Sequence, residues 1–188
     1  MENPVQLETL LNQVANIEIN NNTQRRMRVD VPSKELPAVL ELLKGRAGFM
    51  HLSAISCVDW IEENQFELVY HLWSNQVSTL VSAHIRIDRD PGVYLSVYDL
   101  YTPAAFWERD IHEMYGVFFE GSPDMEKFIL TEWDGPPPMR KEFDSEAWVN
   151  EHFDWQNYRP DWLEELESEG GGIAILPDEQ RFSRKSHD

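Results

Sequence analysis

The densest group of side chains that could do chemistry is the run Glu-Arg-Asp-Ile-His-Glu at residues 108–113. On a helix, Glu108 and His112 are neighbours one turn apart, and so are Arg109 and Glu113. Glu108 and His112 could bind a metal ion together, but a catalytic zinc site needs a third protein ligand, and the pattern His-Glu-x-x-His is absent. A solvated face with two ion pairs is therefore favoured over a metal site. A third interpretation, contact with a partner protein, fits Arg109, because a guanidinium can bind a carboxylate through two parallel hydrogen bonds.

The remaining reactive side chains give weaker signals. His71 and His84 lie on neighbouring expected strands and could face each other as ligands, although strand histidines more often face solvent or form one hydrogen bond. Cys57 lies in an apolar run and is expected to be buried. It is the single cysteine, so it cannot form an intrachain disulfide or hold an iron–sulfur cluster alone. Arg140 and Lys141 form a basic spot that is either ordinary surface charge or a docking contact. Neither a glycine-rich phosphate loop nor a Gly-x-Ser-x-Gly turn is present, so the sequence offers no convincing catalytic group.

The overall charge narrows the classes of partner. The 188 residues carry 34 Asp and Glu against 16 Lys and Arg, a formal net charge of −18. Such a surface repels phosphate backbones and anionic lipids, so direct binding to nucleic acid or membrane is not expected. The amino-terminal residues lack the basic start and apolar core of a signal peptide, and no apolar run approaches the roughly 20 residues that span a bilayer. The chain is therefore expected to be soluble and cytoplasmic, with a neutral, cationic or protein partner.

The elements that must position these side chains follow an α+β order. Helical spacing of apolar residues predicts a helix over 4–17 and a second one with Leu36, Val39, Leu40 and Leu43 on one face, with Ser33 as its cap and Gly45 as its stop. The asparagines at 20–22 are expected to break the pattern. Alternation and β-branched content predict strands at 27–31, 52–60, 65–73, 79–87 and 93–97. Short connections favour antiparallel pairing, so we expect a mostly antiparallel sheet with helices packed on one face.

A third helix is expected to carry the polar run. Thr102 and Pro103 provide a start and Gly116 an end, and a stripe for docking on the sheet is formed by Trp107, Ile111, Met114 and Tyr115. Residues 120–143 are rich in Gly and Pro and are expected to be extended. We place the domain at 1–145 and an acidic tail at 146–188, which has a net charge of −7 from eleven acidic and four basic residues. The tail also carries Trp148, Trp155 and Trp162, and we expect it to lie along a neighbouring protein.

A longer pattern covers residues 98–143. It contains Trp107-Glu-Arg-Asp-Ile-His-Glu-Met-Tyr-Gly116, then Val117-Phe-Phe-Glu-Gly-Ser-Pro-Asp124, Phe128-Ile-Leu130 and finally Pro138-Met-Arg-Lys-Glu-Phe143. In order and spacing, this pattern resembles the 30-kDa subunit family of respiratory complex I, the NADH-quinone oxidoreductase. Asp110 replaces the glutamate usual in that family, Ser122 replaces a histidine, and Pro136-Pro137 stands where Gly-His is expected. These three departures affect individual contacts and not the resemblance to the family.

The resemblance implies a structural subunit without redox centres in the peripheral arm of a proton-translocating NADH:quinone oxidoreductase. FMN and iron–sulfur clusters would lie in partner subunits, among them a quinone-site subunit of the 49-kDa type. The chain would be held at the cytoplasmic side of the membrane through those partners. The implied contact residues are Trp107, Glu108, Arg109, Asp110, Glu113, Met114, Gly116, Gly121, Arg140, Lys141 and Phe143. The alternative is an equivalent scaffold subunit in a membrane-bound nickel–iron hydrogenase or another quinone-reducing relative.

Overall fold

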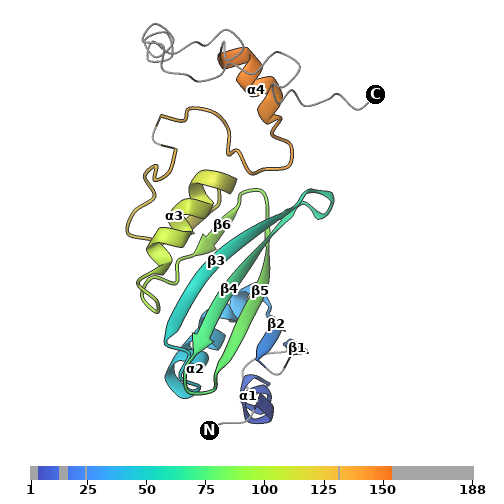
Figure 1. The fold of residues 1–188 in the computed structure, drawn as a ribbon, viewed down its shortest axis with the longest axis vertical. Helices are drawn as coiled ribbons and strands as arrows, with labels where there is room; N and C mark the ends of the chain where they lie inside the picture. Colours follow the sequence, from blue (N-terminus) through green and yellow to red (C-terminus); the bar gives the residue numbers. More distant parts are fainter. Residues whose placement is uncertain (1–3, 13–16, 24, 131, 154–188) are drawn as a thin grey trace, which may run out of the picture. The chain divides into compact units, whose positions relative to one another are not determined.

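A computed structural model describes residues 4–12, 17–23, 25–130 and 132–153 of the chain (Figure 1). The chain divides into two compact units, Met1–Phe143 and Asp144–Asp188. In the second unit the described residues include one helix, α4 (Ser145–His152), which is capped where the Asp144 carboxylate accepts the backbone N–H groups of Glu146 and Ala147. Two of the tryptophans predicted to anchor the tail, Trp155 and Trp162, lie outside the described residues.

The first unit contains a five-stranded sheet with a smaller sheet beside it. Its helices are α1 (Pro4–Leu11), α2 (Leu36–Arg46) and α3 (Ala104–Tyr115), with short 3-10 turns at Ser33–Glu35 and Ile61–Glu63. The large sheet comprises β1 (Glu18–Thr23), β2 (Arg26–Asp30), β3 (His51–Trp60), β4 (Gln65–Ser74) and β5 (Thr79–Asp88). The small sheet pairs β6 (Val93–Leu95) with β7 (Phe118–Glu120).

The large sheet has the spatial order β1-β2-β5-β4-β3. The β3–β4–β5 meander is antiparallel, from Trp60 opposite Gln65 to Ser74 opposite Thr79, as the short connections predicted. β2 pairs with β5 in parallel, and the Val31 amide continues this pairing by donating to the His84 carbonyl at 2.8 Å. The sheet is therefore mixed, with one parallel pair inside a mostly antiparallel arrangement.

One face of the sheet is covered by helices, which confirms the α+β prediction (Figure 1). Along β5 the buried side chains alternate with partly exposed ones, so Val81, Ala83 and Ile85 point into the core. The apolar side chains of all three helices join the same core: Leu7 and Leu11 of α1, Leu36, Val39, Leu40 and Leu43 of α2, and Ile111 of α3. Among the helices of the described residues, none combines the length and apolarity required to cross a bilayer.

Two expected boundaries near the amino terminus were wrong. The first helix ends at Leu11, with Asn12 in a turn and residues 13–16 outside the described chain. The asparagines at 20–22 do not break the chain but lie within β1, an edge strand antiparallel to β2 with a bulge between Asn21 and Thr23. Asparagine has low strand propensity, and here the pairing with β2 overrides it.

Two later predictions also need correction. Gly45 does not stop α2; the helix runs through it to Arg46, and the left-handed turn comes at Gly48, with φ +68°. The left-handed conformation of Gly48 turns the chain back, so that the Phe49 amide donates to the Leu43 carbonyl at the end of α2. Residues 93–97 do not extend the large sheet. Only β6 forms there, and it pairs in parallel with β7, beyond α3 in sequence.

Candidate functional site

Glu108 is the buried centre of the polar run on α3. Its side chain is 0% exposed, and its carboxylate accepts hydrogen bonds from the Ser96 hydroxyl at 2.7 Å and the Val97 amide at 2.8 Å. Glu108 therefore fixes the chain after β6, and the interpretation of a solvated face does not hold at this position.

His112 does not complete a metal pair with Glu108. Its Nδ1 lies 2.9 Å from the Val117 carbonyl oxygen, and its ring packs edge to face against Phe118, with centroids 6.1 Å apart. The two side chains of the expected pair thus bind different segments: Glu108 the chain after β6, and His112 the turn into β7. A helix-borne metal site has no support in this geometry.

Arg109 and Glu113 hold the irregular segment that follows β7. The Arg109 guanidinium donates to the carbonyl oxygens of Glu126 at 2.6 Å and Lys127 at 2.7 Å, and it pairs with Asp124 at 2.7 Å. The carboxylate of Glu113 accepts the two consecutive amides that follow Phe128, each at 2.7 Å. The expected ion pair between Arg109 and Glu113 is thus replaced by bonds from both side chains to residues 124–130.

The far end of this segment returns to the carboxyl end of α3. The Met139 amide donates to the Met114 carbonyl at 3.0 Å, and Arg140 Nε donates to the Tyr115 carbonyl at 2.7 Å. Gly116 ends the helix as predicted, with φ +77°. A Cβ at Gly116 would also lie 3.1 Å from Arg140 Nη2, so this position requires glycine both for its backbone angle and for the approach of Arg140.

A buried carboxylate on β3 holds the next residues. Asp59 is 3% exposed, accepts the Lys141 amide at 2.9 Å and pairs with Arg89, whose Nε lies 2.8 Å from Oδ1. Arg89 in turn pairs with Glu142. Neither Asp59 nor Arg89 was predicted from the sequence, where the signal for Asp59 was a lone carboxylate within the apolar run at 52–60.

The other implied contact residues lie in the same part of the first unit. Trp107, Asp110 and Met114 are partly buried on α3, while Gly121 follows β7 with φ +88°. The pKa of the Asp110 carboxyl is raised, first by burial and then by the charge of Glu113. The ring of Phe143 packs edge to face on Trp133, with centroids 5.7 Å apart. The structure thus gathers the sequence-predicted residues on α3 and residues 117–143, where Glu108, Arg109 and Arg140 bind other segments of the same unit.

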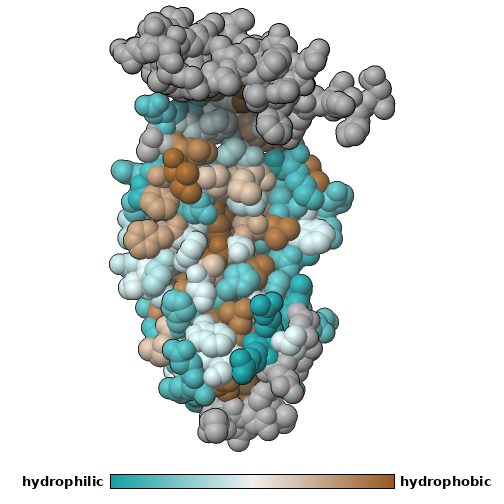
Figure 2. Space-filling model, in the orientation of Figure 1, coloured by the Kyte–Doolittle hydropathy of each residue, from teal (hydrophilic) through white to brown (hydrophobic). Residues whose placement is uncertain are grey.

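Apolar side chains are nevertheless exposed on this part of the chain, and Figure 2 shows apolar residues on the surface of the first unit. Phe106, Phe128 and Ile129 are 61%, 43% and 56% exposed. The two rings lie 6.3 Å apart, and the Arg109 guanidinium covers Phe128 at 5.1 Å from its centroid. Adjoining exposed apolar side chains of this kind are typical of a surface that contacts another protein.

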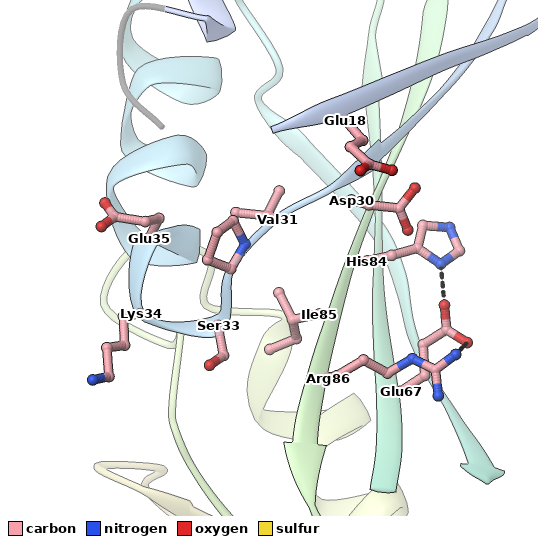
Figure 3. A pocket seen from close by; sticks show the side chains of 11 residues that line it. Glu18, Asp30, Val31, Ser33, Lys34, Glu35, Glu67, His84, Ile85 and Arg86 are labelled. Atoms are coloured by element: carbon pink, nitrogen blue, oxygen red, sulfur yellow. Dashed lines mark hydrogen bonds and ion pairs between the residues drawn. The ribbon is translucent and has the colours of Figure 1, made fainter. Parts of the chain in front are cut away.

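A second polar cluster, which was not predicted from the sequence, lies on the face of the sheet opposite the helices. It lines a cavity of about 600 Å³ between β5, the end of β2 and the turn before α2 (Figure 3). Glu67 on β4 is its centre: His84 Nδ1 and Trp60 Nε1 each lie 2.8 Å from its carboxylate, and Arg28 and Arg86 lie within 3.5 Å. Burial opposes ionisation of Glu67, but the bonds from His84 and Trp60 and the charge of Arg86 outweigh it, so the pKa is lowered.

This cluster does not favour a bound metal ion. Ligand atoms of Asp30, Glu67 and His84 lie within 4.8 Å of one another, which is the spacing of a metal site. However, Arg28 Nη2 lies 2.6 Å from the Asp30 carboxylate and 3.3 Å from that of Glu67. The guanidinium therefore already supplies the cation between the two carboxylates, and a metal ion would have to displace it.

The two strand histidines considered as a ligand pair bind separate partners. His84 is bonded to Glu67, while His71 lies between the hydroxyl groups of Ser56 at 3.3 Å and Ser82 at 3.1 Å. Burial, and then the charge of His84, lower the pKa of His71. Cys57 is buried as predicted, and burial raises the pKa of its thiol.

Comparison with known proteins identifies the family. Residues 29–148, more than half of the chain, match the family model of the respiratory-chain NADH dehydrogenase 30-kDa subunit. The chain belongs to this family. The matched range includes α3 and the segment it holds, so the 30-kDa subunit pattern seen in the sequence coincides with the bonded unit seen in the structure. As a family member, the chain is a 30-kDa-type component of complex I or of a related respiratory complex.

Individual relatives come from more than one kind of complex. The chain is 31% identical over 167 residues to an NADH-quinone oxidoreductase subunit of Phenylobacterium zucineum, covering 80% of this chain and 78% of that one. It is 32% identical over 120 residues to an F(420)H(2) dehydrogenase subunit of Methanosarcina mazei, covering 63% and 76%.

Two solved structures have the same fold. A chain of the membrane-bound sulfane sulfur reductase, an archaeal respiratory membrane complex, superposes with a TM-score of 0.76 at 31% identity, covering 84% of this chain and 95% of that one. A trypsin-resistant fragment of Nqo5 superposes with a TM-score of 0.56 at 23% identity, covering 64% and 97%, which shows the shared fold.

Proposed function

We propose that this chain is a non-redox structural subunit of the peripheral arm of a proton-translocating NADH:quinone oxidoreductase. It would hold electron-carrying neighbours at fixed separation as electrons pass from NADH through flavin and iron–sulfur centres to quinone. The similarity to an NADH-quinone oxidoreductase subunit over four-fifths of the chain supports this choice of complex. The chain would lie at the cytoplasmic side of the membrane, attached through its partner subunits.

The observation that carries the proposal is the bonding of α3 to residues 124–130 and 139–140. These stretches have no regular secondary structure, and Arg109, Glu113 and Arg140 fix them through bonds to backbone groups. Such bonds to charged groups are stronger than neutral ones. They suit a protein whose task is to present a fixed contact surface, with Trp107, Asp110, Met114 and the residues up to Phe143 contributing to it.

We place the cofactors of the reaction in partner subunits. A cysteine-ligated cluster needs several thiolates, and this chain contains Cys57 alone, buried on β3. The FMN and the iron–sulfur clusters would therefore belong to neighbouring subunits, including those beside a quinone-site subunit of the 49-kDa type.

A related complex is the second candidate. The sulfane sulfur reductase chain is matched over 95% of its length, and the F(420)H(2) dehydrogenase subunit is as similar in identity as the NADH-quinone oxidoreductase subunits. In that case, as for a nickel–iron hydrogenase relative, the structural role stays the same and the electron donor changes.

Purification from the native membrane tests the proposal. The tagged chain is isolated in mild detergent, its companions are identified by mass spectrometry, and the oxidation of NADH by quinone is measured. We expect cluster-bearing, flavin-bearing and quinone-site subunits together with NADH oxidation. Oxidation of a different donor would assign the chain to a related complex, and recovery of the chain alone would refute the structural role.

A further inference from the structure

Two exposed aromatic rings beside α3, those of Phe106 and Phe128, lie against each other, and the exposed Ile129 is next to Phe128 in sequence. Phe106 lies on the first turns of α3, and Phe128 packs its ring against it. Ile129 follows in sequence, and its amide is fixed by Glu113 at 2.7 Å. More than two-fifths of each side chain is exposed although the backbone beneath is bonded to the helix, so the exposure is not that of a loose loop. We call these three side chains the Phe106 surface.

Carboxylates border the Phe106 surface. Asp110 lies one helical turn after Phe106, and Glu126 is exposed two residues before Phe128. In the part of the chain that the structure describes, neither carboxylate takes part in an ion pair. The nearby cations are committed elsewhere: Arg109 binds Asp124 and two carbonyls, and the Lys127 ammonium binds the Trp133 carbonyl. The border of this surface therefore carries negative charge that the described part of the chain does not neutralise.

We propose that the Phe106 surface docks into an apolar socket bordered by lysine or arginine on another subunit of the respiratory complex. This inference rests on the proposed function and adds the chemistry of the partner. Apolar side chains supply the buried centre of an interface, while opposite charges at its border set orientation and exclude wrong partners. A second copy of this chain is a poor occupant, because the same carboxylates would face each other and each copy has a net charge of −18.

A cross-linking experiment identifies the occupant directly. Ile129 is replaced by the photo-crosslinking amino acid p-benzoylphenylalanine in the tagged chain, and the complex is irradiated in native membranes. The same replacement at Met50, which is 65% exposed before β3, serves as the control. We expect position 129 to label another subunit of the complex at a peptide that joins apolar residues to lysine or arginine.

Three results of the cross-linking would overturn the inference. They are labelling of a second copy of this chain, labelling of an acidic peptide, and labelling no stronger than at the Met50 control while the complex is recovered. If instead the unmodified tagged chain recovers no respiratory subunit, the proposed function fails, and the inference fails with it.

Charge reversal and truncation provide an independent measurement. Ile129→Ser and Glu126→Lys are compared with Met50→Ser and with Glu41→Lys, an exposed carboxylate on α2. Truncation of one of the few side chains that dominate an interface changes affinity by about tenfold or more, so we expect about tenfold less partner subunit recovered with Ile129→Ser. For Glu126→Lys we expect weaker recovery at low salt and a smaller dependence on salt.

The recovery of partner subunits is compared only among variants that fold as the wild type does. Each variant is checked for an unchanged melting temperature by circular dichroism, since all four side chains are exposed. Equal recovery for the Phe106-surface variants and their controls would overturn the inference while leaving the proposed function intact.

Discussion

The buried carboxylate of Glu108 offers the most direct test of how α3 holds the chain that follows β6. Glu108→Ala removes the acceptor of two hydrogen bonds, from Ser96 at 2.7 Å and Val97 at 2.8 Å, in a position that is 0% exposed. Hydrogen bonds to charged groups contribute about 1.5–3 kcal/mol each, and the buried Val97 amide is left without a partner. We therefore expect a loss of about 4 kcal/mol in the free energy of unfolding.

Glu108→Gln separates hydrogen bonding from size. The amide oxygen of the glutamine can still accept from Val97, and its NH₂ group can donate to the Ser96 hydroxyl. Only the extra strength of bonds to a charged acceptor is lost, so we expect the free energy of unfolding to fall by about 1–1.5 kcal/mol. Glu120→Ala on β7 removes an exposed carboxylate nearby and is expected to stay within about 0.5 kcal/mol of the wild type.

Urea unfolding of the full chain, followed by circular dichroism, provides the assay. With a slope of about 2 kcal/mol per molar urea, the expected losses correspond to midpoint shifts of about 2 M for Glu108→Ala and about 0.6 M for Glu108→Gln. Equal shifts for the two variants, or a Glu108→Ala shift no larger than that of Glu120→Ala, would refute the assignment of Glu108 as the buried acceptor.

Three further outcomes are expected. Gly116→Ala should lower the melting temperature by about 3–6 °C, because it forces an L side chain into φ +77° against Arg140. Gly45→Ala, which adds its methyl group in open space within α2, should raise the melting temperature. Equal effects of the two substitutions would contradict the requirement for glycine at 116. Glu113→Ala should speed amide exchange in the peptide 126–132 about tenfold or more, with no change in β4, by hydrogen-exchange mass spectrometry. The folded-state pKa of Glu67 lies below its ordinary value of 4.5, so the ionised carboxylate stabilises the fold above pH 4.5. This stabilisation is lost as the pH falls through the folded-state pKa. Between pH 7 and 3.5 the urea midpoint should therefore fall less in Glu67→Gln than in the wild type. An equally steep fall would remove Glu67 from the acid response.

Elements with a strong local pattern could be predicted from the sequence. The alternation at 79–87 indicated the buried face of β5, and Gly116 marked the end of α3, whose start lies at Ala104, directly after Pro103 and without the side-chain cap expected from Thr102. In each case the signal comes from neighbouring residues whose period or backbone preference is independent of the rest of the chain.

Pairing across long sequence separations could not be predicted in the same way. Nothing in the residues of β2 indicates a parallel partner at Leu80–His84, and β6 gives no sign that it pairs beyond α3 with β7. Such pairings depend on how the helices cover the sheet, which is decided by the whole core.

For the candidate site, residue types were easier to predict than their partners. Arg109 and Glu108 stood out as hydrogen-bonding groups, but their partners lie in irregular segments at 124–127 and 96–97, where no periodic pattern indicates the structure. The cluster around Glu67 was missed because its members come from β2, β3, β4 and β5 and meet only when the sheet is assembled.

From the parallel pairing of β2 with β5 we expect an order of folding. The β3–β4–β5 meander is joined by short turns and can form from local contacts, but β2 has no strand to join on that side until β5, at residues 79–88, has been made. Contacts of long sequence separation form late, and unpaired strand edges are prone to wrong association. During synthesis, then, the β1–β2 hairpin must wait for β5, and this interval is where we expect a chaperone to improve the yield of the folded protein.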